Sequence, residues 1–266
     1  MKFTFSLITL CLLMLHAASA QTASSLRVLC YNIHYGQGMD GEYDIARLAD
    51  VIKAAKPDLV ALQEVDVGVK RSGRVHQLQK LGELTGLTAR FGPTQHYEGG
   101  LFGNAVLTRL PILDEHIQPL PYTDATPELQ TYPRGALVIT VQAPDGKPLR
   151  FISTHFQHNV PADRVEEARA INRLYADPSD KLRTILAGDF NAKPEEEPIQ
   201  ILQQSWTHAI DAARAPSAPS VNPSSRIDYI FYREASHFRL VSSEVLPEAM
   251  ASDHRPVLAV LEISKP

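Results

Sequence analysis

Cysteine is scarce in this sequence, and the shortage excludes disulfide chemistry. The chain has two cysteines, and the first, Cys11, lies in an N-terminal apolar segment that we expect to be removed. The one cysteine that remains cannot form an internal disulfide, even in a compartment that permits one. Cys30 alternates with apolar neighbours in LRVLCYNI, so we predict a buried strand thiol rather than a nucleophile.

Positive charge is also in short supply. The chain carries 26 Lys and Arg against 30 Asp and Glu, a formal net charge of -4, and its isoelectric point is near 6.2. A general basic surface that grips a nucleic-acid backbone is therefore not expected. The charge weakens a nuclease interpretation without excluding it.

Only one long hydrophobic run is present, and it lies at the N-terminus. Lys2 precedes an apolar run over residues 3–15, and Ala18 and Ala20 form an A-x-A cleavage pattern before Gln21. The run is shorter than the roughly 20 residues that span a bilayer, which disfavours a membrane anchor. We predict a signal peptide over residues 1–20 and a secreted or periplasmic mature chain, residues 21–266, that is monomeric and has no transmembrane span.

The remaining sequence shows no internal repeat and no domain boundary, and alternates strand-like and helix-like segments. Residues 44–56 and 161–175 have the 3.6-residue apolar period of amphipathic helices, and a further helix is predicted around residues 75–85. Short runs of β-forming residues predict strands at 26–33, 58–65, 104–108, 135–142, 149–154, 182–187, 227–232 and 257–263. The Pro- and Ser-rich stretch 214–225 is predicted to be a surface loop. These segments indicate one mixed α/β domain.

Polar residues recur where the predicted strands begin or end. A lone Asn, Asp or His in such a position is commonly a turn or structural residue, but repetition favours a shared site. If the strands lie in adjacent sheets, their ends converge into an oxygen-rich site suited to Mg²⁺ or Ca²⁺. The residues that share this position are Asn32, Glu64, His155, Asp189, Asn191, Asp253 and His254.

The same segments form an ordered series of motifs, YNIH, LQEVD, GNAVLTR, STHF, GDFN, RIDYIF and SDHRPV. In this series the chain resembles the endonuclease/exonuclease/phosphatase superfamily, which includes DNase I-like nucleases, neutral sphingomyelinases and inositol-polyphosphate phosphatases. The resemblance runs from Asn32 to Val257. It implies a four-layer α/β sandwich, with two mixed, mainly antiparallel β-sheets packed face to face and flanked by helices. It also implies metal-dependent hydrolysis of a phosphomonoester or phosphodiester.

The resemblance further implies which residues bind the metal. Glu64 corresponds to the principal Mg²⁺ ligand, and Asn32 and Asp253 lie near the same ion. Mn²⁺ and Ca²⁺ are alternatives to Mg²⁺. Many nuclease members have an acid where this chain has His34, so a second acidic ligand is not expected there.

Five further residues are implied to be catalytic. Asp189 and Asn191 correspond to the pair that contacts the scissile phosphate and positions the attacking water. His254 corresponds to the base, oriented by Asp228, with Asp189 as the alternative base. His155 corresponds to a donor to the phosphate oxygens. Phosphoryl transfer needs charge neutralisation and positioning rather than a covalent nucleophile, which fits this set.

Substrate contacts are assigned to residues outside the motif acids. Arg71, Arg134 and His158 have side chains suited to a phosphate or an anionic head group, with a solvated surface position as the alternative. Asn104 either lines the cleft or fixes a neighbouring segment. We expect residues 92–104, 118–134 and 156–164 to set specificity.

Three functions remain open. The first is a phosphodiesterase or phosphatase acting on a small-molecule, lipid head-group or sugar-phosphate ester. The second is a secreted DNase I-like endonuclease, which would need basic or aromatic loops along a nucleic-acid strand. The third is a catalytically inactive binding module, which the presence of Glu64, Asp189 and His254 disfavours, because buried charges are costly without a role.

Overall fold

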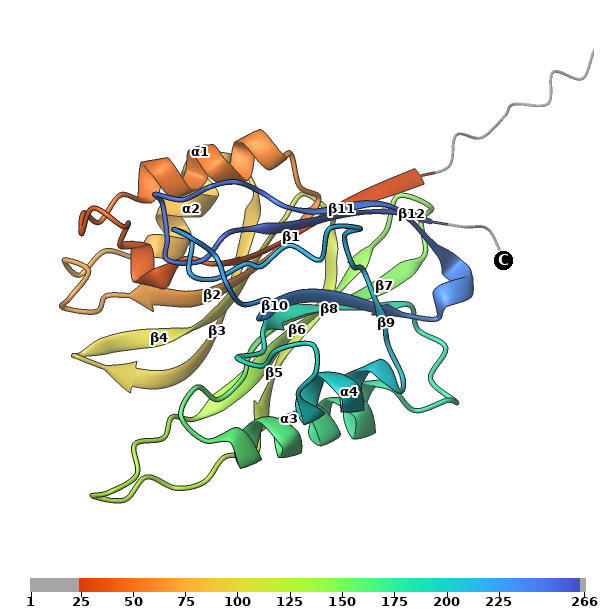
Figure 1. Ribbon diagram of the computed structural model, residues 1–266. Helices are drawn as coiled ribbons and strands as arrows, with labels where there is room; N and C mark the ends of the chain where they lie inside the picture. The colour runs from red at the N-terminus through yellow and green to blue at the C-terminus, as the bar shows by residue number, and fades with distance from the viewer. Residues whose placement is uncertain (1–23, 264–266) are drawn as a thin grey trace, which may run out of the picture.

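The computed structural model describes residues 24–263, which form two six-stranded β-sheets packed face to face (Figure 1). The first sheet has the order β11-β12-β1-β2-β4-β3 and the second β5-β6-β7-β8-β10-β9. Parallel pairing is confined to β1 with β2 and β7 with β8, and the other neighbours are antiparallel. The predicted signal peptide, residues 1–20, lies outside the described residues.

The twelve strands supply the two inner layers. Those of the first sheet are β1 (Ser24–Asn32), β2 (Leu59–Val67), β3 (Thr88–Tyr97), β4 (Gly100–Thr108), β11 (Phe238–Val245) and β12 (Val257–Ile263). Those of the second are β5 (Ile112–Leu120), β6 (Arg134–Gln142), β7 (Pro148–His155), β8 (Thr184–Asp189), β9 (Thr207–His208) and β10 (Asp228–Arg233).

Helices supply the two outer layers. The first sheet is covered by α1 (Ile45–Ala55) and α2 (Gln77–Thr85), and the second by α3 (Pro161–Tyr175) and α4 (Glu197–Gln203) (Figure 1). Three buried apolar clusters lie one between the sheets and one beneath each helical layer. This arrangement confirms the predicted four-layer sandwich. Within residues 24–263, no helix has the length and hydrophobicity that crossing a membrane requires.

Local sequence explains where several helices begin and end. The Asp44 carboxylate accepts a hydrogen bond from the Arg47 backbone N–H at 2.9 Å and caps α1. Lys56 then adopts a left-handed conformation before Pro57, which ends the helix. His76 caps α2 by accepting from the Gln79 backbone N–H at 3.1 Å, which gives this histidine a structural role.

Some elements were not predicted from the sequence. They are β3, β5, β9, β11 and α4, and the strands among them lie at or next to sheet edges, where apolar patterning is weak. The predicted surface loop at 214–225 is only partly at the surface, because Ser217 and Ser220 are fully buried within it. That loop packs against the start of β10 rather than lying free in solvent.

Strand pairing brings the chemically interesting residues to one end of the sandwich. In the second sheet Asp189 is paired with His155 on one side and with Asp228 on the other. Gly188 permits this close pairing, because a Cβ at that position would lie 2.3 Å from the Thr154 backbone oxygen. In the first sheet Asn32 ends β1 and is paired with Gln63 of β2. The two sheets therefore present their polar strand ends side by side.

Candidate active site

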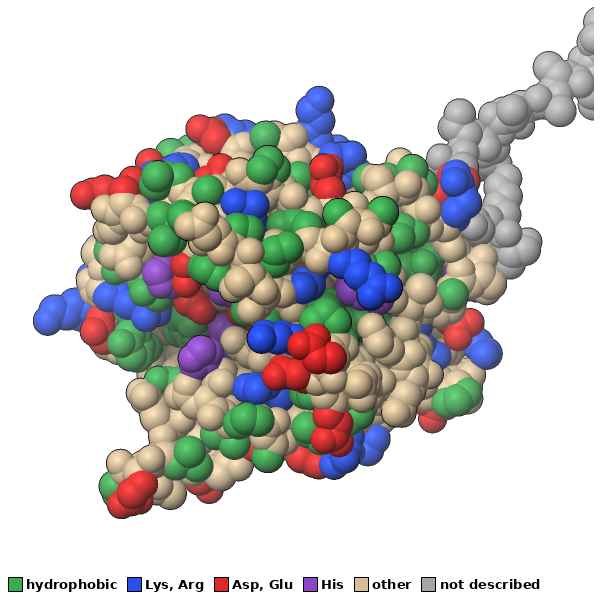
Figure 2. Space-filling model, viewed as in Figure 1, with side chains coloured by type: hydrophobic (Ala, Val, Ile, Leu, Met, Phe, Trp, Pro, Cys, Tyr) green, Lys and Arg blue, Asp and Glu red, His purple; other side chains and the backbone are tan. Residues whose placement is uncertain are grey.

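A pocket of about 380 Å³ opens at this end of the molecule, away from the chain termini. Figure 2 shows histidine, acidic and basic side chains gathered in a hollow at the left of the view. The predicted site residues that line it are Glu64, Arg71, Arg134, His155, His158, Asp189, Asn191, Asp253 and His254. Asn32 and Asp228 lie directly behind this lining, hydrogen-bonded to it. The pocket thus brings together all of the predicted residues except Asn104.

Asn32 joins the two sheets at the base of the pocket. Its Nδ2 donates to Glu64 Oε1 and to Asp189 Oδ2, both at 3.0 Å, and its Oδ1 accepts from the His34 backbone N–H at 3.0 Å. Because the backbone N–H fixes the orientation of the amide, Nδ2 must face the two carboxylates. The geometry shows Asn32 holding Glu64 and Asp189 in place, and direct contact with a metal stays a prediction.

Glu64 is aimed into the pocket by an irregularity in its strand. The register between β2 and β4 shifts between Leu62 and Val65, and Glu64 has a positive φ of 59°. Such conformations are costly for a non-glycine residue and cluster at functional sites. Gln63, its neighbour, points the other way and is fully buried near Ser153 and Cys30.

Asp189, Asp228 and His254 form a buried acid–histidine group. His254 Nδ1 lies 2.9 Å from Asp228 Oδ2, and its Nε2 lies 3.8 Å from Asp189 Oδ2. Burial, and then the negative charge of Asp228, raise the pKa of Asp189 to about 7. Burial alone would lower the pKa of His254, but Asp228 and Asp189 outweigh it and raise the pKa well above the ordinary value. Asp189 can therefore exchange a proton near neutral pH, and the raised pKa of His254 favours its protonated form.

His155 and Asn191 form the neighbouring part of the wall. His155 Nε2 lies 3.0 Å from Asn191 Nδ2 and 3.5 Å from Asp189 Oδ2. Burial, and then the positive charge of Arg134, lower the pKa of His155 well below its ordinary value, so this imidazole is neutral. Asn191 has a positive φ of 48°, and its Oδ1 lies 3.3 Å from His158 Nδ1. These polar groups all face one side of the pocket.

Arg134 is a buried cation without a counterion among the described residues, and its guanidinium carbon lies 5.9 Å from the centre of the Tyr132 ring. Its side chain is 6% exposed, and within residues 24–263 its guanidinium makes neither a hydrogen bond nor an ion pair. Burial lowers the pKa of Arg134 below its ordinary value, while nearby carboxylates oppose the change. The alternative of a solvated surface arginine is therefore wrong for Arg134. A buried guanidinium facing a pocket calls for an anion.

Asn104 is the predicted site residue that neither lines the pocket nor forms a side-chain hydrogen bond to its lining carboxylates and histidines. It is 2% exposed, and its Nδ2 donates to the Gly135 backbone oxygen at 2.8 Å, which ties β4 to β6. The amide is engaged in holding the two sheets together, which corresponds to the second of its two predicted roles. All three predicted specificity segments do contribute to the lining, through Gln95, Tyr97 and Phe102, through Tyr132 and Arg134, and through His158.

Ser217 is a supporting residue that the sequence did not reveal. Its Oγ donates to Asp228 Oδ2 at 2.6 Å and accepts from the Asp228 backbone N–H at 3.2 Å. Its backbone oxygen accepts from the Arg255 N–H at 2.7 Å, next to His254. Ser217 thus fixes both members of the Asp228–His254 pair. A serine eleven residues before an aspartate in a low-complexity stretch carries no sequence signal for this contact.

Glu167 of α3 lies buried beneath the segment that carries His158. Its Oε2 accepts from the Gln157 backbone N–H at 2.9 Å, and its Oε1 has no partner among the described residues. Burial raises the pKa of Glu167 to about 8. The folded chain therefore holds a proton here that the unfolded chain loses above about pH 4.5.

This proton predicts how stability changes with pH. Wild-type stability should fall between about pH 4.5 and pH 8, by at most ~1.4 kcal/mol per pH unit from this group, and the fall should end above pH 8. Glu167→Gln lacks the titrating group, so its free energy of unfolding relative to wild type should rise across that window. Urea unfolding of both proteins at pH 5, 6.5 and 8 measures this, and parallel pH dependences would contradict it.

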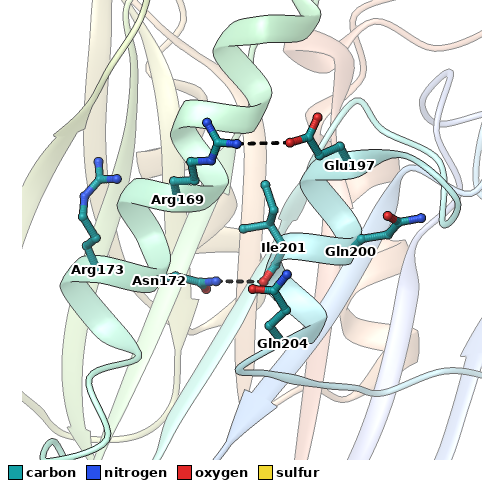
Figure 3. Close-up of a pocket in the computed structure, with 7 residues that line it drawn as sticks. All are labelled: Arg169, Asn172, Arg173, Glu197, Gln200, Ile201 and Gln204. Carbon is teal, nitrogen blue, oxygen red and sulfur yellow. Dashed lines mark hydrogen bonds and ion pairs between the residues drawn. The ribbon is translucent and has the colours of Figure 1, made fainter.

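A second hollow lies between α3 and α4, far from the strand ends (Figure 3). It is larger, about 460 Å³, but several of its polar groups already bond one another. Arg169 pairs with Glu197 at 3.1 Å, and Asn172 donates to the Ile201 backbone oxygen at 2.8 Å. No histidine and only one carboxylate line it. Its chemistry does not fit catalysis.

Two adjoining groups of ligand atoms could hold a divalent cation. Glu64 offers Oε2, which accepts no hydrogen bond from a described residue, beside Asp253, whose side chain is 38% exposed in the same pocket. Asp189, Asp228 and His254 place one ligand atom each within 4.8 Å of one another. The donors are mostly carboxylate oxygens, which suits a hard cation such as Mg²⁺.

Comparison with known proteins identifies a family over most of the chain and solved structures with the same fold. Residues 29–254 match the model of the Endonuclease/Exonuclease/phosphatase family. A solved endonuclease/exonuclease/phosphatase from Beutenbergia cavernae is 26% identical, with a TM-score of 0.73, and the match covers 91% of this chain and 72% of that one. No curated protein matches the chain significantly in sequence.

Two further structures share the fold at lower identity. A mannosyl-6-phosphatase from Bacteroides thetaiotaomicron is 21% identical, with a TM-score of 0.72, and the match covers 90% of this chain and all of that one. The catalytic domain of human Nocturnin, solved with a bound sulfate anion, is 19% identical, with a TM-score of 0.68 and coverage of 90% and 95%.

Proposed function

The chain belongs to the endonuclease/exonuclease/phosphatase family of phosphoester hydrolases, and we propose that it is a Mg²⁺-dependent phosphodiesterase or phosphatase that acts on a small phosphate ester. The observation that carries this proposal is the unpaired, buried guanidinium of Arg134 beside the carboxylate group of Glu64 and Asp189. One side of the pocket attracts an anion and the other a cation. A metal-bound phosphate satisfies both.

Each residue has a definite task in this proposal. Arg134 and His158 hold the phosphate oxygens. Asn191 supports this wall, because its Nδ2 donates to the neutral His155 at 3.0 Å and to the Phe156 backbone oxygen at 3.1 Å, while its Oδ1 faces His158. The proposed metal ligands are Glu64 and Asp253, with Asn32 holding Glu64 in position. When bound, Mg²⁺ would supply charge neutralisation for the phosphate and orient it.

Proton transfer is assigned to the buried acid–histidine group. Asp189 Oδ2 and His254 Nε2 lie 3.8 Å apart, so one water on the pocket side of the two atoms can hydrogen-bond to both of them. Asp189, with its pKa raised to about 7 by burial and by Asp228, can accept the proton that the attacking water loses. His254, oriented through Nδ1 by Asp228, either shares that proton or donates to the departing oxygen.

Substrate size and charge favour a small ester over nucleic acid. The pocket of about 380 Å³ lies near the lower end of the range for small-molecule sites, roughly 300–1,000 Å³. The net charge of -4 provides no general basic surface for a strand. With the A-x-A pattern that ends at Ala20, we propose that the enzyme works in the periplasm or outside the cell.

A substrate panel tests the proposal. The purified protein, with and without Mg²⁺, is given bis-p-nitrophenyl phosphate, p-nitrophenyl phosphate, a hexose 6-phosphate, sphingomyelin, a phosphoinositide and plasmid DNA. Metal-dependent turnover of a small or lipid ester but not of DNA supports the proposal. Nicking of DNA would instead indicate the endonuclease, and turnover of no substrate would indicate the inactive binding module.

A further inference from the structure

The pocket has a second wall, built from aromatic residues around Arg71, to which the catalytic assignment gives no task. The Arg71 guanidinium carbon lies 3.7 Å from the centre of the Tyr35 ring, 4.7 Å from that of Tyr97 and 5.2 Å from that of Phe102. All four residues line the pocket, and Gln95 lies among them in the lining. We call these five residues the aromatic wall.

Arg71 is not a phosphate-binding cation. Its Nε and Nη2 donate to Asp66 Oδ2 and Oδ1, both at 2.9 Å, and Asp66 is fully buried. The Arg71 backbone N–H also donates to Glu98 Oε2 at 2.8 Å. The guanidinium charge is therefore already compensated and its position fixed, in contrast to the unpaired Arg134. The aromatic wall must serve another part of the ligand.

The aromatic wall offers a flat apolar surface with a few free hydrogen-bonding groups. Arg71 lies over both rings, closer to Tyr35 than to Tyr97, and Tyr97 is 39% exposed, so the exposed part of Tyr97 is the main aromatic surface left for a ligand. Arg71 Nη1 and the Gln95 amide make no hydrogen bond with any described residue. A ring with C–H groups on its face and hydroxyls at its edge matches this combination, because it needs both stacking and polar contacts.

We propose that the aromatic wall is an alcohol subsite for a polyhydroxylated ring, so that the substrate is a sugar or cyclitol phosphate. This inference rests on the proposed function, since it places the phosphate at Arg134 and the esterified alcohol at Tyr97. A nucleobase fits less well, because Arg71 already lies over the Tyr35, Tyr97 and Phe102 rings and so occupies the space in which a base would stack between two of them. An acyl chain fits less well, because the free groups of Arg71 and Gln95 would stay unpaired.

The test compares ring and acyclic esters in the purified protein and in matched variants. Glucose 6-phosphate and myo-inositol 1-phosphate represent the two kinds of ring, glycerol 3-phosphate the acyclic control, and adenosine 5′-monophosphate a nucleotide. The variants are Tyr97→Ala, Gln95→Ala and the control Tyr122→Ala. Tyr122 is 40% exposed and does not line the pocket, since Tyr132 and Arg134 are the residues of segment 118–134 that do. The readouts are KM and kcat, with calorimetric binding of each ester measured separately.

Tyr97→Ala should raise the KM for the preferred ring ester about fivefold to tenfold relative to the KM for glycerol 3-phosphate. Gln95→Ala should change the same ratio in the same direction, and Tyr122→Ala should leave it unchanged. A lower KM for glucose 6-phosphate identifies the alcohol as a sugar, and a lower KM for myo-inositol 1-phosphate identifies it as a cyclitol. An equal rise for glycerol 3-phosphate, or preference for the nucleotide, would overturn the subsite.

The two proposals fail in different ways. If the protein hydrolyses phosphate esters but Tyr97→Ala behaves like Tyr122→Ala, the subsite is wrong and the proposed function stands. If no ester is hydrolysed yet the ring esters bind and Tyr97→Ala weakens that binding fivefold or more, the subsite stands and the proposed function is wrong. Absence of both turnover and ring-ester binding would overturn both.

Discussion

Replacing His254 with alanine is expected to lower the kcat of phosphoester hydrolysis by about 10²- to 10⁴-fold, the usual contribution of a positioned acid or base. The imidazole is held by Asp228 at 2.9 Å and faces Asp189 across 3.8 Å, so its loss removes one of two groups that can exchange a proton with the attacking water. The measurement is steady-state hydrolysis of the best substrate from the panel at saturating Mg²⁺. KM should change far less than kcat, because Arg134 is untouched.

A matched control separates chemistry from folding. His237 follows the far end of β10 and makes no side-chain hydrogen bond with a described residue, so His237→Ala should retain wild-type kcat. Thermal unfolding of both variants shows whether they stay folded. A folded His254→Ala protein within about fivefold of wild-type kcat would contradict the assigned role, leaving Asp189 as the working group.

The layers of the fold could be predicted because their causes are local or repeated. The helix at 161–175 was predicted to the residue, and the strands ending in Asn32 and Asp189 follow from apolar runs that stop at polar residues. Glu64 was expected at a strand end but lies at an irregularity within β2, which continues to Val67. The edge strands escaped prediction because residues such as those of β11 alternate poorly and are half solvated. An edge strand forms because it pairs with a neighbouring strand, and the periodicity of its own sequence carries no information about that neighbour.

The site shows the same division. Asp189 and His254 were recognised through motifs. The sequence could not show that the Asn32 amide donates hydrogen bonds to two carboxylates, or that Ser217 donates one to Asp228. Asn104 belongs to one of the motifs but bonds the Gly135 backbone oxygen instead of facing the pocket, because its side chain lies between the sheets. Arg134 appeared equivalent to Arg71 in sequence. Only their contacts show that Arg134 has no counterion among the described residues and is free to bind phosphate, whereas Arg71 is neutralised by Asp66.

The pocket combines groups that destabilise the free protein. Glu64 occupies an unfavourable backbone conformation, Arg134 is buried without a counterion, and Asp189 and Asp228 lie together in a buried group. Each feature costs folding free energy in the absence of a ligand. Each is compensated when a cation meets the carboxylates and a phosphate meets the arginine, which argues for a working catalytic site rather than a degenerate one.

Changing Glu64 to glutamine is therefore expected to raise the Mg²⁺ concentration for half-maximal activity by about 100-fold. Removing a residue that only hydrogen-bonds to a metal ligand lowers metal affinity by about 10- to 100-fold, so the loss of a ligand itself should reach the upper end of that range. Glutamine keeps the size of the side chain and an oxygen that can accept from Asn32 Nδ2, but removes the charge that attracts the metal. A Mg²⁺ titration of activity measures the shift. The control variant is Glu83→Gln, which changes an exposed glutamate of α2. Because calorimetry of Mg²⁺ binding needs no turnover, it decides the point independently. If Glu64→Gln binds Mg²⁺ like wild type, the metal must lie instead in the Asp189, Asp228 and His254 group, and Glu64 acts on the substrate alone.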